Sequence, residues 1–198
     1  MIPHSLPWQV RLGPGHTCAC GGTLISKRHV LTAAHCPTSD EMTVWVGQHT
    51  RIPSDGIPYK VCKSRKHPKW RNDALKGYDI EVLHLAEEVK LNENVQIACL
   101  PKKEDGLNDD FLDGKSLTTS GWGDLYHGQM GCPNELRSVV LPGYSNEKCE
   151  KNTKNILIDW RSERSNSMIC AGEEGKDACQ GDSGGTNISL YLFYYIVK

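Results

Sequence analysis

Residues 175–185 read GKDACQGDSGG, and the last five of them, Gly181–Gly185, place a serine among glycines. A serine hydroxyl alone is a weak nucleophile, and it becomes a useful one only when a neighbouring base takes its proton. Glycine at position 181 can adopt backbone angles closed to other residues and keeps side chains away from an approaching substrate. The stretch therefore predicts Ser183 as a nucleophile, with the N–H groups of Gly181 and Ser183 as donors to a developing oxyanion.

Two motifs earlier in the chain carry the partners that such a serine needs. The stretch LTAAHC, residues 31–36, contains His35, and YDIEVLHL, residues 78–85, contains Asp79. A neutral imidazole accepts a proton near neutral pH and can return it to a leaving group. A carboxylate beside the imidazole holds it in one tautomer. His35 and Asp79 are therefore the candidate base and the candidate acid that orients it.

The order of these three residues along the chain decides between two folds. Gly181–Gly185 also satisfies G-x-S-x-G, the nucleophile turn of α/β-hydrolases, in which the acid and then the histidine follow the serine. The residues after Ser183 contain no Asp, Glu or His, which excludes that fold for this chain. The order His, Asp, Ser instead fits the arrangement found in chymotrypsin.

Short alternating runs bounded by glycine and proline predict β-strands over residues 8–12, 43–46 and 80–85. Many short strands of this kind favour an all-β barrel or sandwich. A helix is predicted around residues 145–152, with Ser145 or Asn146 as its cap. The polar, acidic stretch 102–114 divides the chain near its middle, and it predicts two domains, residues 1–104 and 105–198.

The charge distribution limits the possible partners. The net charge of −1 gives no global field that would attract nucleic acid or an anionic membrane. No apolar run approaches the roughly 18 residues needed to span a bilayer. A local basic run is present, and it is interpreted as a solvated face or, alternatively, as a docking site for an acidic partner; it consists of Lys60, Lys63, Arg65, Lys66, Lys69 and Arg71.

Cysteine content indicates the compartment. Nine cysteines in 198 residues suggest an oxidising environment, and hence a secreted protein. Because the number is odd, at least one cysteine has no partner within the chain.

The sequence shows neither a metal-ligand cluster nor a cofactor motif, so no metal and no cofactor are expected.

The motifs together resemble those of the trypsin-like serine proteases of the chymotrypsin family. The matching stretches are PHSLPWQVRL, CGGTLIS, HVLTAAHC, YDIEVLHL, ACLP, TTSGWG, LPGYSNEKC, MICAG and GKDACQGDSGG. The resemblance implies two six-stranded antiparallel β-barrels that meet at a cleft, the second of them incomplete at its C-terminus. It implies a secreted serine endopeptidase that cleaves after Arg or Lys through an acyl-enzyme on His35, Asp79 and Ser183. The alternative is a non-catalytic or inactive homologue that acts as a binding protein.

The resemblance assigns further roles residue by residue. Asp177 would lie at the base of the primary specificity pocket and pair with a substrate Arg or Lys. Asp182 would be the activation switch, which pairs with a newly released α-amino group. The implied disulfides are Cys20–Cys36 and Cys149–Cys170, and a further pair, Cys18–Cys132, is suggested. The implied partners are protein or peptide substrates with Arg or Lys and protein protease inhibitors.

The two ends of the sequence depart from the family pattern. The activating Ile-Val-Gly-Gly segment would precede the PHS stretch, and TNISLYLFYYIVK follows Gly185 where the family has further barrel strands. We therefore expect the 198-residue chain alone to rest in a zymogen-like state and to turn over an Arg-anilide substrate slowly. Turnover near that of an ordinary trypsin would contradict this expectation.

Overall fold

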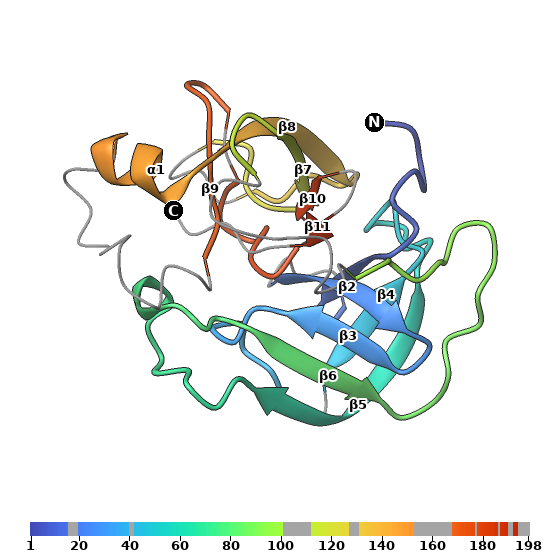
Figure 1. The fold of residues 1–198 in the computed structure, drawn as a ribbon. Coiled ribbons are helices and arrows are strands. Elements are labelled where there is room, and N and C mark those ends of the chain that lie inside the picture. Colours follow the sequence, from blue (N-terminus) through green and yellow to red (C-terminus); the bar gives the residue numbers. More distant parts are fainter. Residues whose placement is uncertain are drawn as a thin grey trace.

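The computed structural model describes residues 1–15, 20–39, 42–100, 112–126, 131–152, 168–176, 178–185, 187–189, 192 and 193. Over these residues the regular secondary structure is almost entirely β-strand, which confirms the predicted all-β class (Figure 1). No helix among them is long and apolar enough to cross a membrane. The elements are β1 (Gln9–Leu12), β2 (Cys20–Ser26), β3 (His29–Thr32), β4 (Thr43–Val46), β5 (Ile57–Lys66), η1 (Ala74–Lys76), β6 (Glu81–Leu85), β7 (Ser116–Gly121), β8 (Arg137–Tyr144), α1 (Asn146–Asn152), β9 (Cys170–Ala171), β10 (Asn187–Ser189) and β11 (Leu192–Phe193).

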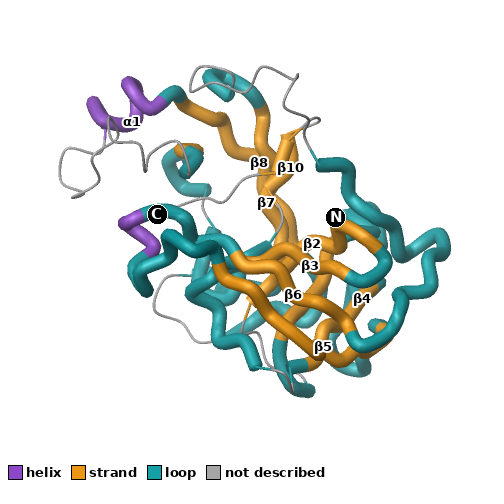
Figure 2. Tube along the Cα trace, turned by 60° about the horizontal axis from the view of Figure 1, so that its bottom comes forward, coloured by secondary structure: helices purple, strands orange, loops and turns teal. Residues whose placement is uncertain are grey.

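Strands β1 to β6 close into a barrel in the order β1-β2-β3-β6-β5-β4, and every neighbouring pair is antiparallel. The barrel occupies the lower part of Figure 1, and the turned view of Figure 2 shows its strands wrapping around a common centre. The three strands predicted from alternation are β1, β4 and β6, so the period-two pattern located them to within one residue. Closure leaves this unit without a free strand edge.

The barrel interior is filled by the apolar residues that alternate along its strands. Leu12, Leu24, Val44, Leu83 and Leu85 are each completely buried. In β6 the inward positions alternate with half-buried outward ones, as a strand with one buried face requires. Val82 and His84, which alternate with these buried positions, therefore lie on the outer face of the barrel.

The second half of the chain forms an open sheet in the order β11-β10-β7-β8-β9. Its longest pairing is β7 with β8, from Ser116 opposite Pro142 to Gly121 opposite Arg137. This sheet lies above the barrel in Figure 1. The described residues thus show a partial sheet in place of a second closed barrel, in agreement with the predicted incomplete second unit.

Buried hydrogen bonds join the sheet to the barrel. The Ser120 hydroxyl on β7 donates to Gln9 Oε1 on β1 at 2.9 Å, and both residues are buried. Trp122 is 1% exposed, and its Nε1 donates to the carbonyl of His49 at 3.2 Å. Because an unpaired buried polar group is costly, these bonds fix how the two halves meet.

Helix α1 and the disulfides lie where the sequence predicts them. Ser145 caps α1, since its Oγ accepts from the backbone N–H of Lys148 at 3.4 Å. Disulfides join Cys20 to Cys36 and Cys149 to Cys170. Cys132 is also disulfide-bonded; Cys18 lies outside the described residues, so the pair Cys18–Cys132 stays a prediction. Among the described cysteines, the free thiols are Cys62, Cys99 and Cys179.

The closed barrel makes a prediction about stability. Leu24 is completely buried, whereas Leu91 is 37% exposed. We expect Leu24→Ala to lower the free energy of unfolding by about 2–5 kcal/mol, because the substitution removes buried methyl groups and leaves a cavity. Leu91→Ala is the matched control and should change it by less than about 0.5 kcal/mol. Urea unfolding measures both, and equal effects would show that the barrel interior is not the stabilising core.

Candidate active site

The carboxylate of Asp79 holds His35 at two points. Asp79 Oδ1 accepts from the backbone N–H of His35 at 2.8 Å, and Asp79 Oδ2 lies 2.6 Å from His35 Nδ1. The Asp79 side chain is 9% exposed and that of His35 is 41% exposed. A carboxylate that accepts from Nδ1–H leaves the lone pair of a neutral imidazole on Nε2. The ring is therefore held in the tautomer that a general base needs.

The strands explain how two residues 44 positions apart come together. His35 follows β3 and Asp79 precedes β6, and these two strands pair directly, with Thr32 opposite Glu81 at the end of the ladder. Glu81, fully buried beneath this end, accepts from the Thr38 hydroxyl at 2.9 and 3.1 Å. Strand pairing thus delivers the histidine and the carboxylate to the same edge of the barrel.

Nearby charges shift the proton affinity of His35. The hydrogen bond to Asp79 raises the pKa of His35 above its usual 6.5, and the negative charge of Asp79 adds to this increase. Partial burial and the positive charge of Lys66 lower it, but they do not reverse the direction. The influence of Lys66 was not predicted from the sequence, where it belonged only to a basic run.

The backbone of Ser183 is fixed against the barrel beside His35. Its carbonyl oxygen accepts from the N–H of Gly21 at 2.7 Å. The sulfur of Cys36 packs 3.7 Å from the same oxygen, and this sulfur belongs to the disulfide with Cys20. Because Cys36 directly follows His35 in the chain, these contacts bring the serine and histidine segments together. Among the residues that the structure describes, the sulfurs grouped with His35 are those of Cys20 and Cys36, and both belong to this disulfide.

The glycines after Ser183 are required by close packing. Gly184 has φ +71°, and a Cβ there would collide with the Thr32 side chain and the Gly21 carbonyl. A Cβ on Gly185 would come within 2.6 Å of the Ser120 carbonyl oxygen. The motif therefore lies in the narrow junction between barrel and sheet. Gly181, with φ +97°, completes the turn that precedes the serine.

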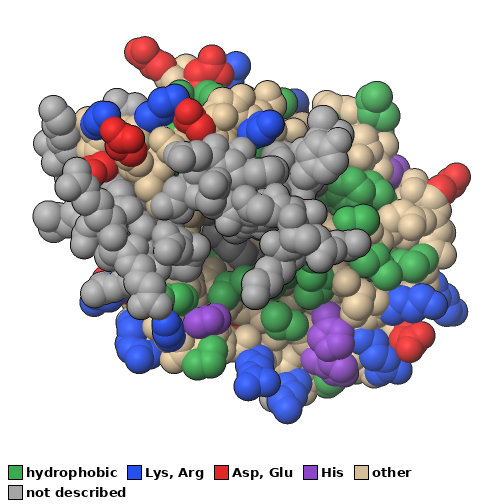
Figure 3. Space-filling view, in the orientation of Figure 1, with side chains coloured by type: hydrophobic (Ala, Val, Ile, Leu, Met, Phe, Trp, Pro, Cys, Tyr) green, Lys and Arg blue, Asp and Glu red, His purple; other side chains and the backbone are tan. Residues whose placement is uncertain are grey.

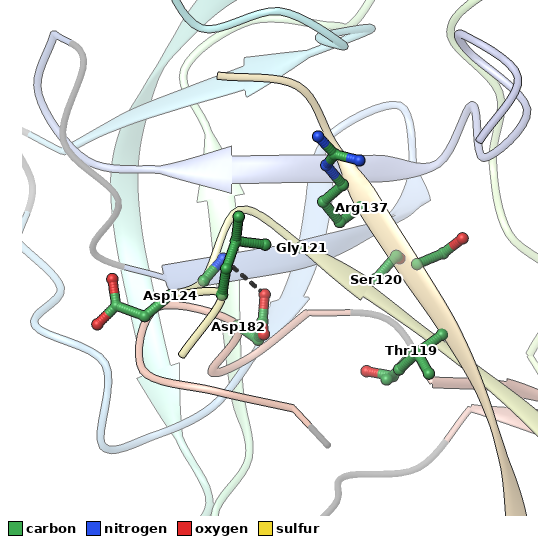
Figure 4. Close-up of a pocket in the computed structure, with 10 residues that line it drawn as sticks. Thr119, Ser120, Gly121, Asp124, Arg137 and Asp182 are labelled. Atoms are coloured by element: carbon green, nitrogen blue, oxygen red, sulfur yellow. Dashed lines mark hydrogen bonds between the residues drawn. The ribbon is translucent and has the colours of Figure 1, made fainter. Parts of the chain in front are cut away.

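Asp182 is bound on the opposite side of this turn. Its Oδ1 accepts from the N–H of Gly123 at 2.7 Å and its Oδ2 from the N–H of Cys179 at 2.9 Å. A Cβ on Gly123 would come within 2.5 Å of the carboxylate, which explains glycine in the GWG stretch. A cavity of about 280 Å³ lies beside the carboxylate, and Figure 4 shows Asp182 facing it; the lining includes Thr119, Ser120, Gly121, Asp124 and Arg137.

The predicted specificity residue Asp177 lies outside the described residues, so its position at the base of a pocket stays a prediction. The oxyanion-hole assignment of Gly181 and Ser183 is likewise a prediction, because it concerns N–H groups directed at a substrate. The structure brings together the segments of His35, Asp79, Ser183 and Asp182.

The contact between His35 and Asp79 predicts how His35 titrates. We expect Asp79→Asn to lower the pKa of His35, since the neutral amide removes the main cause of the increase. Lys66→Gln, the matched control, should raise this pKa slightly. Histidine NMR titration measures both shifts, and an unchanged pKa in Asp79→Asn would contradict the account.

The same shift links the pair to stability. Because folding raises the pKa of His35, the pair contributes its full stabilisation below pH 6.5, the ordinary value for the group. This contribution is lost as the pH rises through the folded-state pKa.

Comparison with known proteins identifies the family. The family model described as Trypsin matches residues 2–192. The clotting factor G beta subunit of Tachypleus tridentatus is 36% identical over 197 residues, which cover 92% of this chain and 62% of that protein. The chain therefore spans less than two thirds of the length of this relative.

A solved structure shows the same fold. Neuropsin, a serine protease expressed in the limbic system of mouse brain, superposes with a TM-score of 0.79 at 32% identity. The match covers 98% of this chain and 82% of the neuropsin chain. The fold, the His35–Asp79 geometry and these matches lead to one conclusion: the chain belongs to the trypsin family of serine proteases.

Proposed function

We propose that this protein is a secreted serine endopeptidase that hydrolyses peptide bonds after Arg or Lys. Its catalytic residues are His35 as general base, Asp79 as the acid that orients it, and Ser183 as nucleophile. The observation that supports this most directly is the pair of hydrogen bonds between Asp79 and His35. Asp79 Oδ1 is 2.8 Å from the backbone nitrogen of His35, and Asp79 Oδ2 is 2.6 Å from Nδ1 of its ring. Family membership supports the reaction class.

The reaction proceeds in two halves. Ser183 Oγ attacks the carbonyl carbon of the scissile bond while its proton moves to His35 Nε2. The oxyanion that forms accepts hydrogen bonds from the N–H groups of Gly181 and Ser183. His35 then gives the proton to the leaving amine, and the bond to nitrogen breaks to leave an acyl-enzyme. Water attacks this ester, again giving a proton to His35, which returns it to Ser183 as the acid product leaves.

Local geometry supports the role of Ser183. A nucleophile must be held within reach of its base, and a displacement of even 1 Å can cost about 100-fold in rate. The hydrogen bond from Gly21 N–H to the Ser183 carbonyl and the packing of Gly184 and Gly185 restrict movement of the serine backbone.

Asp177 is proposed as the residue that selects Arg or Lys. A carboxylate at the bottom of a pocket would favour a basic side chain, because each charge would otherwise be buried unpaired. Substrates would then be proteins or peptides with exposed Arg or Lys, and protein inhibitors that present the same residues would block the site.

Asp182 is proposed as the activation switch. In this role its carboxylate would exchange backbone donors for a released α-amino group, and this exchange would order the oxyanion donors one residue away. The cavity beside Asp182, about 280 Å³ in volume, supports the proposal because it offers space for an entering chain terminus.

The alternative, a non-catalytic homologue that acts by binding, is less well supported. A binding protein could have the same fold, but it would not need His35 to be held in one tautomer. A covalent serine probe distinguishes the two functions.

Fluorophosphonate labelling tests the enzyme proposal. We expect covalent labelling of a form that begins with a free Ile-Val-Gly-Gly segment ahead of this chain, and complete loss of labelling in Ser183→Ala. Ser116→Ala, an exposed serine at the start of β7 that does not line the cavity beside Asp182, is the matched control and should label like the wild type. If the extended form does not label, the binding homologue becomes the better account.

Substrate preference tests Asp177. In the same extended form, Asp177→Asn should lower kcat/KM for an Arg-anilide by about 100-fold or more, since a buried charge pair loses one partner. An anilide with an apolar residue in place of Arg serves as the control and should lose far less. Equal losses on both substrates would argue against Asp177 as the specificity residue.

A further inference from the structure

Two histidines face each other across neighbouring strands on the outside of the barrel. His29 begins β3 and lies directly opposite His84 of β6 in the strand register. His29 Nε2 and His84 Nδ1 are 3.0 Å apart, and the rings meet edge to face with centroids 4.7 Å apart. Neither histidine has a part in the proposed reaction.

The pair lies at the protein surface. Both side chains are half-buried, so solvent reaches them. Figure 3 shows a histidine patch on the lower face of the molecule, over the region of β3 and β6, with lysine and arginine side chains around it. An ion could therefore approach the two rings from solvent.

Ser26 contacts the His29 ring at the nitrogen that does not face His84. Ser26 Oγ lies 2.8 Å from His29 Nδ1 and also accepts from the N–H of Arg28 at 3.1 Å. When His29 Nδ1–H donates to Ser26, the lone pair of His29 is on Nε2, which faces His84. A hydrogen bond from the far ring nitrogen to a fixed acceptor is the usual support of a metal-binding histidine.

We propose that His29 and His84 form a surface site for a divalent transition-metal ion that prefers imidazole, such as Zn²⁺ or Ni²⁺. An ion at about 2.0–2.1 Å from two nitrogens in tetrahedral geometry holds them about 3.3 Å apart. The observed 3.0 Å lies within a few tenths of an ångström of this value, and each ring must also turn so that its lone pair points to the ion and not to the other ring. Water molecules complete the coordination.

Metal binding needs no oxidant, and it leaves both imidazole rings neutral. In the metal-free state one of the two facing nitrogens carries a hydrogen and the other accepts it. On binding, both facing nitrogens present lone pairs, so His29 keeps its hydrogen on Nδ1, toward Ser26, and His84 carries its hydrogen on Nε2, toward solvent. The proton moves between the two nitrogens of His84 through water.

Two side chains on the adjoining strand border the site. Lys63 lies opposite His84 on β5, and its positive charge opposes a cation. The thiol of Cys62 donates to the backbone carbonyl of His84 at 3.4 Å. The proposal requires neither side chain, and both provide controls.

The site would connect β3 and β6, the two strands that position the candidate catalytic pair. β3 leads to His35, and β6 follows Asp79, with His29–His84 at one end of the ladder and Thr32–Glu81 at the other. The ladder is about 10 Å long. An ion bound to the folded state alone would raise Tm with its concentration.

Zinc titration of the whole chain tests the proposal. We expect the NMR signals of His29 and His84 to shift together with one equivalent of Zn²⁺, while that of His67 stays unchanged. His29→Gln and His84→Gln should each weaken zinc binding by about 100-fold, because one histidine would then hold the ion in place of two. Both should abolish the zinc-dependent rise in Tm. Ser26→Ala should weaken binding by about tenfold.

The controls separate this site from other zinc ligands. His67→Gln and Cys62→Ser should bind zinc like the wild type, and Lys63→Gln should bind it somewhat more tightly. The proposal is wrong if His29→Gln and the wild type bind equally, if Cys62→Ser alone removes binding, or if the two histidine signals respond at different zinc concentrations. Mg²⁺, which prefers oxygen ligands, should produce none of these effects.

Discussion

The carboxylate of Asp79 is the constraint on which the candidate site depends. It is nearly buried, and its two oxygens bind one residue, at the backbone N–H and at the ring of His35. A single hydrogen bond would leave the imidazole free to rotate about it. Two bonds, one to the backbone, fix the position of the residue and the direction of its ring, so that Nε2 is left for chemistry.

The closed barrel makes this contact possible. Pairing of β3 with β6 brings the end of one strand and the start of the other to the same edge, and the buried leucines of β6 fix the face that each residue presents. A shift of one residue in register would move every side chain of β6 to the opposite face. The packing of the barrel is thus directly connected with the orientation of the imidazole.

Much of this could be predicted from the sequence because the signals are local. Alternation located β1, β4 and β6, and the motifs around His35, Asp79 and Ser183 indicated the family. Contacts between distant residues could not be predicted in the same way. The effect of Lys66 on His35 and the facing of His29 and His84 depend on the β3–β6–β5 order, which no local pattern contains. Similarly, the cavity beside Asp182 arises only where β7 and β8 meet the serine turn.

The pH dependence of fluorophosphonate labelling tests the central claim most directly, because it reads the proton on His35 through the reactivity of Ser183. In the extended, activatable form, the account predicts a labelling rate that rises with pH around a midpoint above 6.5, the ordinary pKa of histidine. Asp79→Asn should lower both the rate and this midpoint. A midpoint that stays the same in Asp79→Asn would contradict the claim that Asp79 controls the candidate base.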